Sequence, residues 1–118
     1  MIQWQTSESH WMFSEHLTPE EKSLSEELRR QTAWIESHIW IASSGTTRKS
    51  GVRWVGLHKN AFLVGAKAVN EHLRVQINDI WLNVLPHFHV GGLAIFARAH
   101  LLKNEVFDLS NQKWDANK

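Results

Sequence analysis

The chain has 118 residues, of which 42% are hydrophobic and 21% charged, with a formal net charge of +1. This length allows one modest hydrophobic core, as in a single domain or part of one. So small a net charge gives no electrostatic reason to expect a nucleic-acid or membrane partner. The absence of cysteine excludes disulfides and thiolate chemistry, and we expect a cytoplasmic protein. No stretch approaches the roughly 18–20 apolar residues that span a membrane.

The N-terminal third predicts an arm followed by a surface helix. Residues 1–17 show no clear hydrophobic period, so we expect a loosely structured arm that packs its aromatic side chains against the body. Thr18 is suited to cap a helix, Pro19 suits the first helical position, and Glu21 completes a capping box. We expect this helix to end at about Thr32.

Strands and helices alternate from residue 38 onward. We expect strands over residues 38–42, 52–57, 79–85 and 106–109, and helices over residues 61–73, capped by Asn60, and 92–102. Such alternation favours an α/β fold, here a partial, mostly parallel sheet with right-handed crossover helices. We therefore divide the chain into an N-terminal arm and surface helix (residues 1–37) and an incomplete α/β domain (residues 38–118).

A turn of small, hydroxyl-bearing residues follows the first of these strands. Its members are Ser43, Ser44, Gly45, Thr46 and Thr47, and the basic residues Arg48 and Lys49 come directly after them. Glycine lets backbone N–H groups face inward, hydroxyls donate further hydrogen bonds, and a nearby cation neutralises an anion. The pattern predicts a phosphate-type loop, although a polar, solvated hairpin also fits this spacing. No Walker A motif occurs in the chain.

A cluster of two histidines and a phenylalanine follows the strand over residues 79–85, which Pro86 ends. Alternate residues of a strand face the same side, so His87 and His89 could chelate a metal together with His58, as in a small metal-dependent hydrolase. No cysteine exists and no carboxylate lies nearby in the sequence, so we predict no metal site. Polar residues at the end of a strand are the plain alternative.

Both stretches resemble the adenylate-forming superfamily of acyl-CoA synthetases, luciferases and peptide-synthetase adenylation domains. Ser44-Gly45-Thr46-Thr47 matches the core of its phosphate loop, although Arg48 stands where the family has glycine. The segment Leu85-Pro86-His87-Phe88-His89-Val90-Gly91-Gly92-Leu93 matches its Leu-Pro-x-Phe-His-x-x-Gly motif. The continuation over residues 93–99 is most similar to o-succinylbenzoate–CoA ligases of menaquinone biosynthesis. The resemblance covers roughly residues 38–116.

This resemblance implies an acid–CoA ligase that activates a carboxylate with ATP and Mg²⁺ through an acyl-AMP and then transfers the acyl group to CoA. The loop residues Ser43, Ser44, Gly45, Thr46 and Thr47, with Arg48 or Lys49, would hold the ATP phosphates. The residues His87, Phe88, His89, Gly91 and Gly92 would border the acyl group. Such a site requires residues 43–49 and 86–92 to lie at one edge of a common sheet.

Other elements of the family are missing from this sequence. Members carry a Tyr-Gly-x-Thr-Glu stretch for adenine and magnesium and a Thr/Ser-Gly-Asp stretch for the ribose. This chain has no tyrosine, and none of its glycines is followed by aspartate. We therefore expect an inactive N-terminal fragment, whose open sheet edges would favour self-association. The alternative is a non-catalytic interaction or binding module derived from this half-domain.

Overall fold

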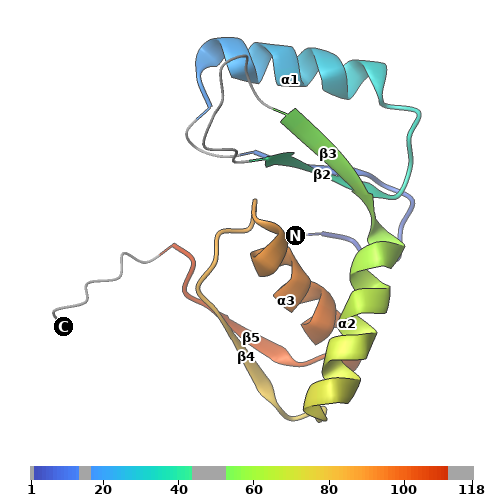
Figure 1. Ribbon diagram of the computed structural model, residues 1–118, viewed down its shortest axis with the longest axis vertical. Coiled ribbons are helices and arrows are strands. Elements are labelled where there is room, and N and C mark those ends of the chain that lie inside the picture. The colour runs from blue at the N-terminus through green and yellow to red at the C-terminus, as the bar shows by residue number, and fades with distance from the viewer. Residues whose placement is uncertain (1, 14–16, 44–52, 112–118) are drawn as a thin grey trace, which may run out of the picture. The chain divides into compact units, whose positions relative to one another are not determined.

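The computed structural model describes residues 2–13, 17–43 and 53–111 (Figure 1). In chain order the elements are β1 (His10–Met12), α1 (Pro19–Gln31), β2 (His38–Ser43), β3 (Arg53–His58), α2 (Lys59–Leu73), β4 (Ile80–Asn83), α3 (Val90–Leu102) and β5 (Glu105–Asp108). The chain divides into two compact units, Met1–Ala61 and Phe62–Lys118, which are described separately. No helix in the described part of the chain has the length and apolarity to cross a membrane.

The first unit contains a three-stranded sheet in the order β1-β2-β3. β1 runs parallel to β2, with Trp11 opposite Trp40, and β2 runs antiparallel to β3. The helix α1 connects the two parallel strands, as a parallel pairing requires. The prediction of a loosely structured arm is therefore wrong for His10–Met12, which form an edge strand. The Trp11 ring stacks on that of Trp40 with centroids 5.0 Å apart, and this contact favours the pairing.

The helix α1 starts as its sequence predicts. The Thr18 hydroxyl accepts a hydrogen bond from the Glu21 N–H (3.1 Å), and the Glu21 carboxylate accepts one from the Thr18 N–H (3.2 Å). The buried position of this helix is Ser25, whose hydroxyl accepts a hydrogen bond from Trp54 Nε1 at 2.7 Å. Leu24 of the same helix is 54% exposed. A polar contact thus anchors α1 to β3.

The two faces of this sheet are packed differently. On one face the rings of Trp11, Phe13 and Trp54 lie within 4.9–6.4 Å of one another, centroid to centroid. The Trp40 ring lies over Gly56, where an added Cβ would be 2.7 Å from a ring carbon. Alternation along β2 turns Ile39 and Ile41 to the opposite face, and both are buried.

Lys59, the first residue of α2, forms hydrogen bonds that hold the N-terminal segment in place. Its side chain is buried at 2% exposure, and Nζ donates to the carbonyl oxygens of Gln3 and Thr6, the latter at 3.0 Å. Burial lowers the pKa of Lys59, and the charge of Glu8 raises it in part. The predicted cap at Asn60 is wrong, because the helix begins at Lys59, two residues before the predicted start, and the Asn60 N–H donates to His58 Nδ1 at 3.0 Å.

The second unit contains a two-stranded parallel sheet, in which α3 connects β4 to β5 (Figure 1). The Arg98 guanidinium of α3 lies over the Trp81 ring of β4, 5.5 Å from its centroid. Ile80, Leu82 and Phe107 alternate with the residues on that covered face and are 57–58% exposed. α3 therefore covers one face of this sheet, while the apolar residues of the other face remain exposed.

The expected α/β class is confirmed, since both parallel strand pairs are joined by helices. The expectation of one sheet is wrong for the described strands. β2 pairs with β1 and β3, whereas β4 pairs with β5 in a separate sheet. β3 follows β2 in a hairpin and is therefore antiparallel to it. A parallel third strand would have required a second crossover connection. Our division at residue 38 remains a prediction about domains.

Candidate functional site

The predicted phosphate loop begins where β2 ends. Ser43 is the last residue of β2 and pairs with Arg53 of β3. The remaining loop residues, Ser44, Gly45, Thr46, Thr47, Arg48 and Lys49, lie outside the described residues. The stated condition of a common sheet for residues 43–49 and 86–92 is not met by the described strands, because β2 and β4 belong to different sheets. The role of the loop in binding phosphate stays a prediction.

The second stretch forms a turn between β4 and α3. The His89 N–H donates to the Pro86 carbonyl at 3.1 Å, and the Leu93 N–H donates to the His89 carbonyl at 3.1 Å. His89 is the N-cap residue, with an extended backbone and no capping hydrogen bond from its side chain. The helix starts at Val90, two residues before the predicted Gly92, so both glycines lie in its first turn.

Gly92 has a packing role in this turn. A Cβ added there would lie 2.5 Å from the Pro86 carbonyl oxygen and 3.0 Å from that of Leu85. At Gly91 an added Cβ would meet only the flexible end of the Leu85 side chain, at 2.8 Å. The absence of a side chain at Gly92 therefore lets α3 approach the backbone that follows β4. The predicted role of Gly91 and Gly92 beside an acyl group stays a prediction.

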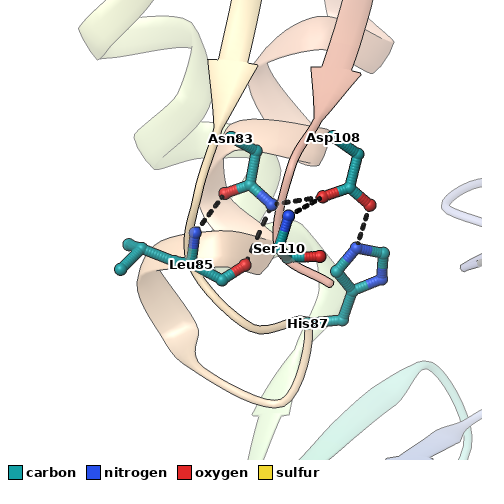
Figure 2. A network of polar contacts seen from close by, with 5 residues as sticks. All are labelled: Asn83, Leu85, His87, Asp108 and Ser110. Atoms are coloured by element: carbon teal, nitrogen blue, oxygen red, sulfur yellow. Dashed lines mark hydrogen bonds and ion pairs between the residues drawn. The ribbon is translucent and has the colours of Figure 1, made fainter. Parts of the chain in front are cut away.

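Five residues at the carboxyl ends of β4 and β5 form a polar network (Figure 2). Asn83 is fully buried; its Nδ2 donates to the Leu85 carbonyl (2.9 Å) and to Asp108 Oδ1 (3.1 Å). Its Oδ1 accepts from the Leu85 N–H at 3.2 Å. The Ser110 N–H donates to Asp108 Oδ1 at 3.1 Å, and His87 Nε2 lies 2.5 Å from Asp108 Oδ2.

The electrostatics of the network centre on Asp108. Burial alone would raise the pKa of its carboxyl group, but hydrogen bonds from Ser110, His87 and Asn83 outweigh this and lower the pKa to about 2. The ionised carboxylate accepts, so Nε2 of His87 donates and carries the proton. Figure 2 shows the other ring nitrogen of His87 directed away from Asp108. The arrangement holds the His87 ring with Nε2 as the donor to Asp108.

The aromatic rings of His87, Phe88 and His89 do not form one cluster. The His87 ring meets Phe96 of α3 edge-on, with centroids 4.8 Å apart, whereas the Phe88 and His89 rings lie 4.9 Å apart. The premise that His87 and His89 share one face is wrong, because both follow the end of β4 instead of lying in a strand. Within the described residues, no group of three or more His, Cys, Asp or Glu side chains could hold a metal ion.

The sequence reasoning missed three members of the network: Asn83, Asp108 and Ser110. A signal for Asp108 was present in the predicted topology. The strands over residues 79–85 and 106–109 were expected to be parallel and joined by one helix, and the carboxyl ends of such strands meet at one edge. Asp108 could thus have been placed near His87. No comparable signal marks Asn83, whose bond to Asp108 joins residues 25 positions apart.

Comparison with solved structures gives matches of low similarity. No protein-family profile and no curated protein sequence matches the chain. Among solved structures, the chain is similar to that of apo MatB from Rhodopseudomonas palustris, at 20% identity and a TM-score of 0.49. The match covers 67% of this chain and 15% of the MatB chain. Such a likeness carries no argument about activity or substrate.

Proposed function

We propose that this chain is part of an acid–CoA ligase of the adenylate-forming superfamily. The observation that carries the proposal is the Leu85–Leu93 motif, which matches the family pattern in residue type and order. In the described structure this segment follows β4 as a turn and continues into the first turn of a helix, with Gly92 closely packed against the Pro86 carbonyl. A cleft-forming segment of an α/β enzyme has this local organisation, since loops after parallel strands carry function.

The finer assignment is a ligase of the o-succinylbenzoate–CoA type. It is supported by residues 93–99 of α3, which continue the motif with the residue types of that subgroup. In the parent enzyme Phe88 and His89 would border the acyl group. Ser43, Ser44, Thr46 and Thr47, with Arg48 or Lys49, would hold the ATP phosphates.

This chain alone does not supply a complete site for ATP and Mg²⁺. Adenylation needs the base, ribose and triphosphate to be held together, so that the α-phosphorus lies in line with the carboxylate. The sequence lacks tyrosine and any Gly-Asp pair, and the described residues bring no three candidate metal ligands together. We therefore propose that the chain by itself is inactive.

The test begins with the genomic reading frame around this sequence. We expect the frame beyond codon 118 to encode Tyr-Gly-x-Thr-Glu and Thr-Gly-Asp stretches. The product of that longer frame should catalyse carboxylate-dependent ATP–pyrophosphate exchange, fastest with o-succinylbenzoate among aromatic and short aliphatic acids, whereas the 118-residue chain should not. A longer frame without both stretches, or a product without exchange activity on any acid, would overturn the proposal. Exchange with another acid only would overturn the finer assignment.

A non-catalytic interaction module is the second candidate. The observation that favours it is the exposed apolar face of the β4–β5 sheet, where Ile80, Leu82 and Phe107 are more than half exposed. Groups of apolar residues at the surface commonly mark sites of protein association. ATP titration distinguishes the candidates in the longer product, because a ligase binds ATP and an interaction module does not.

A further inference from the structure

We propose that two copies of this chain associate through the free edge of β4, forming a continuous four-stranded sheet in the order β5-β4-β4-β5. The proposal does not depend on the ligase assignment, because it rests on the backbone and side chains of the second unit alone. The partner is a second copy of the chain, and the contact is antiparallel pairing about a two-fold axis.

The first step concerns which backbone groups of β4 are free. The Leu109 N–H donates to the Asn83 carbonyl, which identifies Asn83 as a β4 residue whose backbone bonds to β5. Successive residues of a strand direct their backbone groups to opposite sides, so Trp81 also bonds toward β5. The N–H and C=O groups of Ile80 and Leu82 therefore point away from β5. Among the described strands, β4 has no second neighbour to receive them.

The second step is that this edge is self-complementary. In antiparallel pairing centred on Leu82, that residue lies opposite Leu82 of the second copy, and Ile80 lies opposite Val84. Ile80 and Leu82 fall on the exposed face of the sheet, at 57% and 58% exposure, and Val84, which directly follows the last residue of β4, is 43% exposed. Pairing would therefore unite two apolar rows and would satisfy the free backbone groups of both strands.

The third step is a comparison of the charges on the strand edges. Residues 80–85 carry no charged side chain. β5 has Glu105 at one end and Asp108 at the other, so its antiparallel self-pairing would place carboxylates opposite each other. In the other described sheet the edge strands are β1 and β3. β3 begins with Arg53 and ends with His58, whereas β1 has only three residues, His10–Met12, all of them half-buried. Charge therefore favours β4 over β3 and β5, and its exposed apolar residues favour it over β1. The acidic edges of β5 would stop the sheet at four strands.

The test is the oligomeric state of the full chain, measured by sedimentation equilibrium over a range of concentrations. We expect a monomer–dimer equilibrium that approaches twice the 13.7 kDa chain mass. Leu82→Lys should raise the dimer dissociation constant by about tenfold or more, because two ammonium groups would then face each other across the axis. Val64→Lys is the matched control, since Val64 is 70% exposed on α2, and it should leave the equilibrium unchanged.

Charge pairing tests the register directly. Leu82→Glu should also dissociate the dimer, whereas an equimolar mixture of the Leu82→Lys and Leu82→Glu chains should form a heterodimer. Far-UV circular dichroism should show unchanged secondary structure in every variant, since Leu82 is 58% exposed in the monomer. A chain that stays monomeric, an open-ended aggregate, or a dimer that survives Leu82→Lys while Val64→Lys disrupts it would overturn the proposal. Failure of the mixture to associate would overturn the register.

Discussion

The two units of this chain differ in how completely the two faces of their sheets are covered. Each contains a parallel strand pair joined by a helix. In the first unit a hairpin extends the pair to three strands, with an aromatic cluster on one face and the buried Ile39 and Ile41 on the other. In the second unit α3 covers one face and the apolar residues of the other face are exposed. A βαβ motif thus supplies one covered face, and the second face needs another element or another chain.

The two units also differ in which parts of the chain their polar contacts connect. In the first unit Lys59 and Ser25 hold elements far apart in sequence, through the N-terminal segment and through Trp54. In the second unit the principal network lies at the strand ends and joins Asn83, His87 and Asp108. We expect the first set to contribute mainly to stability, and the second to fix the conformation of the turn that carries the family motif.

Substitution of Lys59 should have the largest effect. We expect Lys59→Met to lower the free energy of unfolding by about 2–4 kcal/mol, because the carbonyl oxygens of Gln3 and Thr6 lose their donor. Urea denaturation measures the change. Lys67→Met, at an exposed position of the same helix, should change it by less than about 0.5 kcal/mol. Equal effects of the two substitutions would show that Lys59 does not anchor the N-terminal segment.

Gly92 tests the packing of the turn in the second unit. Gly92→Ala should cost about 1–3 kcal/mol, because its Cβ would overlap the Pro86 carbonyl oxygen. Gly65→Ala in α2 should instead stabilise by about 0.5–1 kcal/mol, since nothing lies within 4 Å of its added Cβ. Thermal unfolding monitored by circular dichroism gives both values. A stabilising Gly92→Ala would mean that α3 does not need this close approach.

Ser25 tests the attachment of α1 to the sheet of the first unit. Ser25→Ala should cost about 1–2 kcal/mol, because it leaves Trp54 Nε1 without its acceptor. Ser23→Ala, on the exposed side of α1, is the matched control and should be nearly neutral. The measurements are chemical denaturation and the tryptophan emission spectrum. Because alanine favours a helix more than serine does at both positions, a loss for Ser23→Ala as large as that for Ser25→Ala would show that the hydrogen bond to Trp54 is not the cause.

Asp108 should have the smallest effect, and its effect should depend on pH. Its pKa is about 2 in the folded chain and 3.8 as the reference value, so its ionisation stabilises the fold above about pH 4. That contribution is lost as the pH falls from about 4 through about 2. Asp108→Asn should cost about 1 kcal/mol at neutral pH, since solvent screens the partly exposed group.

Urea denaturation at pH 7 and at pH 2.5 measures the Asp108 effect. The stability difference between Asp108→Asn and the unmodified chain should be smaller at the lower pH. Glu105→Gln, which neutralises the exposed carboxylate at the other end of β5, controls for net charge. If Glu105→Gln reproduces the same pH dependence, the network around Asp108 is not its cause.

Local signals in the sequence predicted most of the secondary structure. Thr18, Pro19 and Glu21 form a capping box because these contacts span only three residues, and the structure confirms it. Pro86 ends β4 close to the predicted place. β1 was missed because three residues give too short a pattern to identify a strand, and its pairing depends on Trp40, far along the chain.

Only the parts of the candidate site that depend on residues close together in the sequence could be predicted. The Leu85–Leu93 motif was identified from residue order alone, and its turn lies between a strand and a helix as expected. The interaction of His87 with Asp108 joins residues 21 positions apart. It depends on the register of β4 with β5, which no local pattern specifies.

The sequence by itself determined the helices, the main strands, the mixed α/β class and the resemblance to the adenylate-forming superfamily, because each depends on residues close together in the chain. Only the tertiary structure decided that β2 and β4 belong to different sheets. It also decided that Lys59 is buried and that one face of the β4–β5 sheet keeps its apolar residues exposed. These outcomes depend on which distant segments pair and which faces are covered, and the hydrophobic pattern of one segment does not contain that information.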